Sequence, residues 1–384
     1  VDNVDDDCKA TQSCSTCSTF NQVDIDHIKS KGWDTIRLGV TWAGAQPNDE
    51  DALDDAFLAR LHAILDLCDE NGIHVILDNH GDMVGSAGCG NGVPMWFQQA
   101  AAPNLIGKQL TTGFPYSLIP SLRVEDVGGY DTCGDNESKW GEYAGDPNYN
   151  MLNECCQAMN SGNPGGLGFT KISQATMDYM IQEGDGRDAF VRYWRLMAEA
   201  VVEHPSAFAA ELMNEPMTIR RREAFQTWRA AAEAINTVIP DMSVALADTG
   251  ESALFPSFVT EISAYLGGGL SIDRDTMNWI KESNNVFYAW HWYGTPSSAD
   301  SAVKSVQAIQ TSWDVPAFYT EGMSCDSWTA ALDAGISVSY WHYSAYCNAG
   351  STSAEYFGDI TIPDDSFGAC ILGWGSGNSD YTCD

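Results

Sequence analysis

Short apolar segments that end in polar residues recur along this chain, and amphipathic segments separate them. The clearest amphipathic segment is 54–71, where Phe57, Leu61 and Leu65 recur at helical spacing and Gly72 follows as a helix terminator. Strands that alternate with helices predict an α/β fold with a parallel sheet. The predicted strands are 35–40, 73–77, 207–213, 243–247, 286–290, 316–319 and 336–340. The predicted helices are 23–31, 54–71, 187–203, 219–238, 301–311 and 328–334.

The polar residues of this pattern fall at the carboxyl ends of the predicted strands. Parallel strands open these ends onto one face of the fold, where α/β enzymes place their sites. A doubly wound sheet would gather such residues at one switch point, whereas here nearly every strand contributes. We therefore expect a closed (β/α)8 TIM barrel forming a single catalytic domain over residues 1–384. The strand-end residues are Arg37, His80, Asn214, Glu215, His291, Tyr293, Glu321 and Trp341.

One long segment interrupts the alternation. Residues 81–186 are rich in Gly, Asn and Pro and hold four cysteines. A connection of this length is usually functional or a small subdomain. We expect a stapled, Cys-rich loop insertion on the active-site face, after the third strand if a first strand precedes the visible ones. Residues 345–384 are expected to form a Cys-containing tail packed on the barrel.

The chain has 12 cysteines, most of them outside apolar segments. This distribution predicts disulfides that staple loops, and hence a secreted, extracellular protein, although the pairing cannot be deduced. Cys68 lies on a helical apolar face and is expected to be a free core thiol. The pair Cys14 and Cys17 lacks the second pair or histidine cluster that a structural zinc site needs, so we expect no metal.

The charge balance limits the partners. Lys and Arg number 19 against 53 Asp and Glu, a net charge of −34. Such a surface repels phosphate backbones, so we expect no nucleic-acid partner and a neutral or cationic substrate. We find no apolar segment long enough for an integral membrane span. We also find no signal peptide, so the sequence is expected to be mature. The protein is expected to be a monomer.

Two of the strand-end residues, Glu215 and Glu321, are glutamates on different strands. A pair of carboxylates across a neutral polar substrate is the apparatus of glycoside hydrolysis. One carboxyl must be a protonated acid and the other must stay ionised. Arg37 and Tyr293 are the kind of donors that keep a nucleophilic carboxylate ionised, and Asn214 could donate to a sugar 2-hydroxyl. Flat apolar faces for sugar rings are offered by Trp341, Trp42, Trp96 and Trp292.

Taken singly, these residues have ordinary structural explanations. Asn214 and Glu215 could cap the helix that follows them. Arg37 could pair with a surface acid, His291 could be a satisfied core histidine, and Trp341 could be a core residue. The functional interpretation is favoured because all of them occupy the same position in the repeating unit.

The ordered set from Arg37 to Trp341 resembles glycoside hydrolase family 5, a family of retaining (β/α)8 β-glycosidases, over about residues 24–343. The resemblance implies Glu215 as acid/base and Glu321 as nucleophile. It also implies contacts of Asn214 with the sugar 2-hydroxyl, support of Glu321 by Arg37 and Tyr293, and a sugar subsite lined by His80 and His291 with Trp341 as its floor.

A narrower likeness concerns three motifs. Residues 36–42, 77–82 with Asp82, and 89–96 with Trp96 are similar to the endoglycoceramidase-type branch, which has a comparable Gly-x-Gly-x-Pro-x-Trp. The cellulase branch is the broader comparison. One departure is that residues 1–20 show no strand before the first helix, where family members have one.

We thus expect a secreted retaining β-glycoside hydrolase that needs no cofactor and acts by double displacement on β-1,4-glucan or other β-glucosides. An endoglycoceramidase-like glycolipid hydrolase or a β-mannanase is the alternative. The expected partner of this protein is a β-linked oligosaccharide, polysaccharide or glycolipid. A catalytically silent carbohydrate-binding barrel and a metal-dependent barrel hydrolase are alternatives of other classes.

Overall fold

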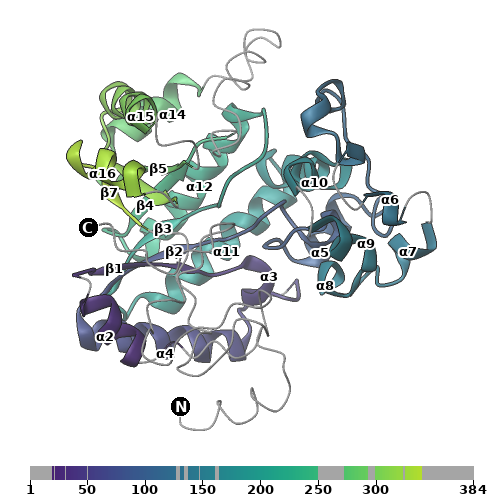
Figure 1. Cartoon of the computed structure of the whole chain (residues 1–384). Helices are drawn as coiled ribbons and strands as arrows, with labels where there is room; N and C mark the ends of the chain where they lie inside the picture. Colours follow the sequence, from purple (N-terminus) through teal and green to yellow (C-terminus); the bar gives the residue numbers. More distant parts are fainter. Residues whose placement is uncertain are drawn as a thin grey trace.

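A parallel sheet organises the protein. The structure, a computed structural model, describes residues 20, 22–30, 32–49, 51–126, 130–133, 137–146, 148–160, 164–249, 272–292, 299–322 and 325–339. Seven strands pair in chain order, each parallel to the next (Figure 1). The strands are β1 (Thr35–Gly39), β2 (His74–Asp78), β3 (Ala207–Glu211), β4 (Ser243–Ala247), β5 (Val286–His291), β6 (Ala317–Glu321) and β7 (Ser337–Val338).

Helices connect successive strands and pack against the sheet. The longest are α12, α4 and α11, and α11 packs along α12. Their bounds are α2 (Gln22–Ser30), α3 (Trp42–Ala45), α4 (Asp55–Asn71), α11 (Asp185–Val201), α12 (Arg221–Val238), α14 (Arg274–Glu282), α15 (Ala299–Trp313) and α16 (Cys325–Asp333). Strands in sequential order with crossover helices are the (β/α)8 barrel arrangement, which confirms the predicted fold class.

Side chains alternate between two faces along the strands. On β4, Val244 and Leu246 belong to the main core between strands and helices, whereas Ala245 and Ala247 belong to a second cluster inside the sheet. β5 repeats this pattern, with Phe287 and Ala289 in the inner cluster. Along the strands, polar residues follow this inner cluster, as Asp78 follows Ile76 on β2 and Glu211 follows Ala209 on β3.

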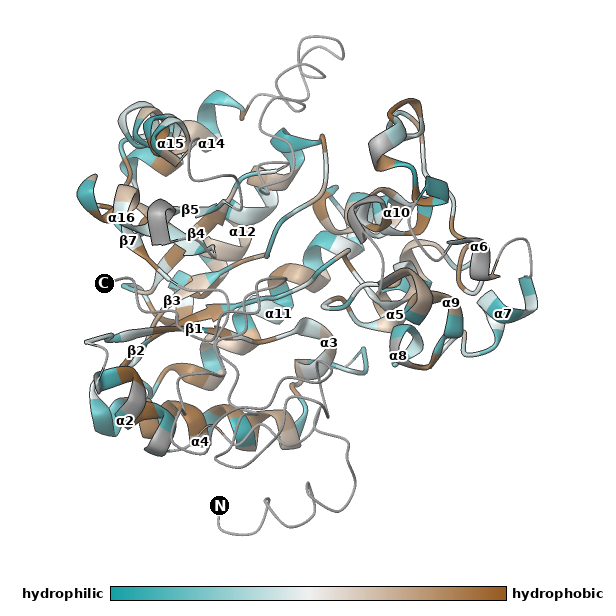
Figure 2. Ribbon diagram, in the orientation of Figure 1, coloured by the Kyte–Doolittle hydropathy of each residue, from teal (hydrophilic) through white to brown (hydrophobic). Residues whose placement is uncertain are grey.

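Local signals set the limits of α4. The Asp54 carboxylate accepts a hydrogen bond from the Phe57 N–H at 2.8 Å, which caps the first turn. Gly72 ends the helix at φ +68°, a left-handed conformation that glycine adopts without strain. Between these caps, buried Leu61, Leu65 and Cys68 make the inward face. Figure 2 shows hydrophobic and hydrophilic residues alternating along this helix.

The segment between β2 and α11 forms a body beside the sheet (Figure 1). It holds a hydrophobic cluster of its own around Trp140, Tyr149 and Leu167. Disulfides Cys89–Cys156 and Cys133–Cys155 lie within it. Its helices are η2 (Ser86–Gly88), α5 (Met95–Ala101), η3 (Tyr116–Leu118), η4 (Pro120–Leu122), η5 (Val124–Asp126), α6 (Tyr130–Cys133), α7 (Glu137–Gly141), α8 (Tyr149–Leu152), α9 (Glu154–Asn160), η6 (Pro164–Phe169) and α10 (Lys171–Ile181).

The predicted elements compare closely with these. All seven predicted strands exist, and the predicted disulfides within 81–186 are present, with Cys68 free and buried. The insertion follows the second described strand, and it is built of short helices more than of loop. The nine-residue helix α14 was not predicted. Residues 1–19 and the tail 345–384 lie outside the described residues. None of the described helices is long and apolar enough to cross a membrane.

Candidate active site

Arg37 on β1 is the centre of a buried charge network at the carboxyl ends of the strands. Its Nε and Nη2 donate to the two Glu211 oxygens at 2.7 and 2.9 Å. Nη1 donates to Glu321 Oε2 at 3.0 Å, and Nη2 also lies 2.9 Å from Asn214 Oδ1 and 3.0 Å from Asp78 Oδ1. Burial alone would lower the Arg37 pKa, but these carboxylates raise it well above the ordinary value, so the guanidinium stays charged.

His291, the last residue of β5, faces three glutamates. Its Nδ1 lies 3.1 Å from Glu215 Oε1 and 3.7 Å from Glu321 Oε2, and its Nε2 lies 3.6 Å from Glu211 Oε1. Burial favours the neutral ring, but the charge of Glu321 and the facing carboxylates of Glu211 and Glu215 raise the His291 pKa to about 10. The ring is therefore an imidazolium at neutral pH.

The two predicted catalytic glutamates lie close together. Ligand oxygens of Glu215 and Glu321 and a ring nitrogen of His291 are all within 4.8 Å of one another. The Glu321 side chain is 7% exposed, and Glu215 is 16% exposed. Three such groups could also hold a cation, but the Arg37 guanidinium 3.0 Å from Glu321 opposes a second positive charge there.

The two buried glutamates near Arg37 titrate in opposite directions. Burial raises the pKa of Glu321, and the charge of Glu215 adds to this, while His291 and Arg37 act against it. Burial would likewise raise the pKa of Glu211, but its paired bonds with Arg37 and the nearby His291 lower it to about 2. Glu211 is thus a permanent anion that neutralises part of the Arg37 charge.

His80 extends the network along β2. Its Nδ1 lies 2.7 Å from Asp78 Oδ2 and its Nε2 lies 3.5 Å from Asp82 Oδ1. Burial opposes a charge on the ring, but Asp78 and Asp82 raise the His80 pKa well above its ordinary value. The Asn214 side-chain amide donates to Asp82 Oδ1 at 3.2 Å, so Asp82 joins His80 to the end of β3.

The backbone after β2 and β3 fixes these side chains. The Asn214 N–H donates to Asn79 O, and the Asn79 amide donates to Leu212 O, both at 3.1 Å. Glu215 follows at φ +39°, a left-handed conformation that costs a non-glycine residue energy and that clusters at functional sites. A Cβ on Gly92 would lie 2.3 Å from the Gly81 Cα, so the insertion passes hard against the end of β2.

The aromatic residues that were expected to face a sugar differ in their burial. Trp42 was expected as a possible sugar platform, but it is fully buried and stacks on Tyr193, so it is a core residue. Trp292 is also buried in the main core, 7% exposed. Trp96 is half-buried, and its Nε1 donates to Gln46 O at 3.0 Å. Tyr293 and Trp341 lie outside the described residues.

Sequence reasoning missed three buried acids of this region. Asp78 and Glu211 hold Arg37, and Asp248 at the end of β4 pairs with Arg221 at 2.7 Å. Side chains on a strand point alternately to its two faces, and this alternation could have identified two of the three acids. Asp78 follows inner Ile76, and Glu211 follows inner Ala209, so both point to the face that Arg37 occupies.

The barrel fold and this network of carboxylates indicate the class of this protein, the glycoside hydrolase barrels. The model of the family described as Cellulase (glycosyl hydrolase family 5) matches residues 4–112. Over these residues the chain is similar to glycoside hydrolase family 5, with local likeness to endoglycoceramidases.

Individual relatives agree with this. Endoglycoceramidase I of Rhodococcus hoagii is 34% identical over 125 residues, which are 32% of this chain and 24% of that protein. Endoglycoceramidase of Hydra vulgaris is 24% identical over 202 residues, 52% of this chain and 32% of that protein. These matches span about a quarter to a third of the curated relatives. The solved structure of endo-glycoceramidase II from Rhodococcus sp. shares the fold, with a TM-score of 0.55, 18% identity, and coverage of 91% of this chain and 73% of that one.

Proposed function

We propose that this protein is a retaining β-glycoside hydrolase, with Glu215 as acid/base and Glu321 as nucleophile. The proposal rests on one observation above all: oxygens of the two carboxylates lie within 4.8 Å of each other at the carboxyl ends of β3 and β6. Retaining glycosidases hold their carboxyl groups about 5 Å apart, whereas inverting enzymes separate them by about 6.5–9.5 Å to admit a water.

The first step transfers the sugar to the protein. Glu215 gives its proton to the glycosidic oxygen while an oxygen of Glu321 attacks the anomeric carbon. The bond between that carbon and the leaving oxygen breaks, and an ester between the sugar and Glu321 forms. Arg37 and His291 stay positively charged beside Glu321, so they stabilise the carboxylate before the attack.

The second step releases the sugar. Glu215, now a carboxylate, takes a proton from a water that attacks the same carbon, and the ester bond to Glu321 breaks. Two inversions leave the β-configuration unchanged. Asn214 is held by Arg37 and Asp82, which supports its proposed contact with the sugar 2-hydroxyl, and His80, which also contacts Asp82, is proposed to line the same subsite.

For the substrate we propose a glycolipid with a β-linked sugar. The relatives named endoglycoceramidase support this, as does the motif at residues 89–96, which lies at the start of the insertion. We propose that the insertion, residues 81–186, shapes the part of the cleft that accepts the lipid. A second candidate is a β-1,4-glucan, which the family match described as Cellulase favours. The two disulfides support secretion.

The experiment compares hydrolysis of lactosylceramide in detergent, cello-oligosaccharides and manno-oligosaccharides, with product configuration followed by NMR. We expect the β-anomer first, and fastest release from the glycolipid. Glu321→Gln should abolish turnover, and Glu215→Gln should lower it by about 10²–10⁴-fold on unactivated substrates. Glu70→Gln, on the exposed face of α4, is the control and should match the parent.

Each result decides between the candidates. Preference for cello- or manno-oligosaccharides would replace the glycolipid by a glucan or a mannan. Sugar binding without turnover by the parent would make the protein a carbohydrate-binding barrel. Loss of activity on chelation would favour a metal-dependent mechanism. Release of the α-anomer would contradict double displacement.

A further inference from the structure

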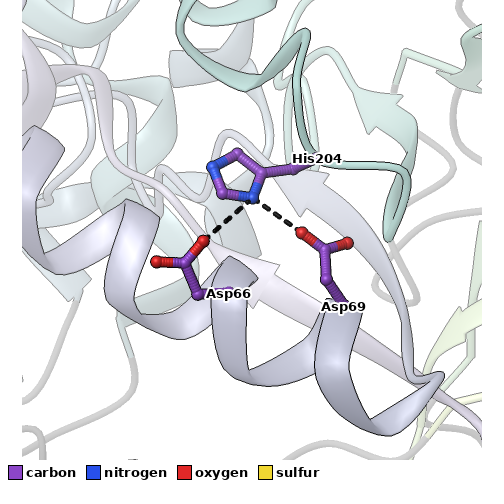
Figure 3. A group of neighbouring side chains, drawn as sticks. All are labelled: Asp66, Asp69 and His204. Atoms are coloured by element: carbon purple, nitrogen blue, oxygen red, sulfur yellow. Dashed lines mark hydrogen bonds and ion pairs between the residues drawn. The ribbon is translucent and has the colours of Figure 1, made fainter.

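A second cluster of ionisable side chains lies away from the carboxyl ends of the strands. Asp66 and Asp69 come from the last turns of α4, and His204 comes from the turn between α11 and β3, three residues before the strand begins (Figure 3). The cluster thus sits where β3 enters the sheet, whereas Glu215 and Glu321 lie where strands end. It takes no part in the network around Arg37.

Both aspartates face the same nitrogen. His204 Nδ1 lies 2.8 Å from Asp69 Oδ2 and 3.7 Å from Asp66 Oδ1 (Figure 3). A ring nitrogen carries at most one proton, so it can donate to only one of these carboxylates. The Asp69 bond uses that proton, and 3.7 Å is too long for a hydrogen bond. The Asp66 carboxylate therefore faces the His204–Asp69 pair without accepting a hydrogen bond from His204.

The charge of this group is also unbalanced. Asp66 and Asp69 are three residues apart on one helix face, where like charges destabilise a helix. Among the ion pairs between described residues, neither has a lysine or arginine partner. A divalent cation between the three ligand atoms would remove both the repulsion and the competition for one proton.

The side chains around this position are already oriented for a metal ligand. Asp69 Oδ1 accepts the Ser206 N–H at 2.7 Å, which leaves Oδ2 to point at His204. On the other side of the ring, His204 Nε2 lies 2.8 Å from His62 Nδ1. With a metal on Nδ1, the His204 proton sits on Nε2 and His62 accepts it, the outer contact that metal-bound histidines usually make.

From this geometry we propose a binding site for a divalent first-row transition ion such as Zn²⁺, ligated by His204 Nδ1, Asp69 and Asp66, with His62 as a positioning residue. All three ligand atoms lie within 4.8 Å of one another. Ligands at zinc distances of about 2.0–2.2 Å lie roughly 3.3 Å from one another, between the 2.8 and 3.7 Å seen here. Mg²⁺ and Ca²⁺ prefer oxygen-only ligands and should bind poorly.

The ion would join the end of α4 to the chain entering β3. We therefore expect a structural effect on the full-length protein, measured as the rise in Tm when Zn²⁺ is added after chelator treatment, with calorimetry for affinity and stoichiometry. Zn²⁺ and Mn²⁺ should raise Tm, and Ca²⁺ at the same concentration should not. Hydrolysis of β-glycosides should be unchanged, because this site lies apart from the glutamates.

Variants separate this site from other ligands for zinc. Asp66→Asn keeps the His204–Asp69 bond and its side chain is 69% exposed, so it should fold like the parent and lose the zinc-induced rise. In the parent, the rings of His62 and His204 lie 5.1 Å apart between centroids. His62→Phe should keep this ring contact but lose the hydrogen bond, and weaken the affinity for Zn²⁺ about 10- to 100-fold. Asp55→Asn, about 16 Å along the same helix, is the charge-matched control and should bind normally.

Two results would overturn the proposal. One is a parent protein whose Tm and calorimetric signal do not respond to Zn²⁺ or Mn²⁺. The other is a zinc response that survives in Asp66→Asn and in His204→Ala, since the ion would then bind elsewhere, such as at cysteine thiols.

Discussion

At the scale of single residues, the sequence identified Arg37 and the polar residues at the strand ends, but not Asp78 and Glu211, which hold Arg37. Arg37, Asn214, Glu215, His291 and Glu321 were predicted and lie together. The polar residues at strand ends were conspicuous because apolar residues precede them. The acids that hold Arg37 were missed because each looks like part of its strand, and only side-chain alternation reveals that it points inward.

The titration of Glu321 gives a prediction for activity. Glu321 must be ionised to attack, and burial raises its pKa above the ordinary 4.5. Activity should therefore fall, as the pH is lowered, through a value above 4.5. Glu211→Gln removes an anion that offsets the Arg37 charge, so the Glu321 pKa should drop and the acid limb should move to lower pH. The measurement is kcat/KM against pH.

Glu211→Asp is the matched control for this prediction. It keeps the charge, so its acid limb should stay close to that of the parent even if its Tm falls. A purely structural role for Glu211 would lower Tm in both variants and leave both pH profiles in place. That outcome would show that Glu211 does not act on Glu321 through Arg37.

At the scale of elements, all seven strands and the helices that flank them were predicted, except α3 and α14, and the helices of the insertion were not. α14 follows Asp273, whose carboxylate accepts from the N–H groups of Asp275 and Thr276. Only Thr276 and Ile280 are buried on it, so its hydrophobic pattern is too weak to be read without the cap. Apart from the 11-residue α10, the helices of the insertion are shorter still, and many of their buried residues pack into the cluster around Trp140.

The disulfides of the insertion give a prediction at this scale. Cys89–Cys156 closes a loop with a sequence separation of 67. Replacing both cysteines by alanine should lower the unfolding free energy by about 2–4 kcal/mol, because the unfolded chain gains freedom. Chemical denaturation measures this. The acid limb of kcat/KM should not change, since neither cysteine touches the Arg37 network; a shifted limb would contradict the separation of the two regions.

At the scale of the whole molecule, the repeating pattern was sufficient to predict the barrel, because nearly every predicted strand ends in polar residues. The net charge was equally visible, and it acts on the folded state as a whole. A charge of −34 repels itself most when the chain is compact. The surface ion pairs between described residues, such as Arg195–Glu199, are exposed and offset little of this repulsion.

Salt should therefore stabilise the protein at neutral pH. Raising NaCl from about 0.01 to 0.15 M shortens the screening length from about 30 to 8 Å, and we expect Tm to rise by about 2 °C or more. Scanning calorimetry checks this. The increment should shrink as the pH is lowered toward the pI of about 4.2, where repulsion vanishes. An increment that is independent of pH would mean that the salt acts by another route.

The insertion between β2 and α11 has its own apolar cluster and its own covalent links, whereas the charged groups around Arg37 are supplied mainly by the strands. Mutations within that apolar cluster should therefore leave the strand-borne groups around Arg37 in place. Asp82, which contacts Asn214 and His80, is where the insertion joins those groups. A homologue in which this segment is replaced would keep the proposed catalytic residues and change its substrate specificity. We expect natural variation among relatives of this chain to be concentrated there, and directed evolution of selectivity to succeed there first.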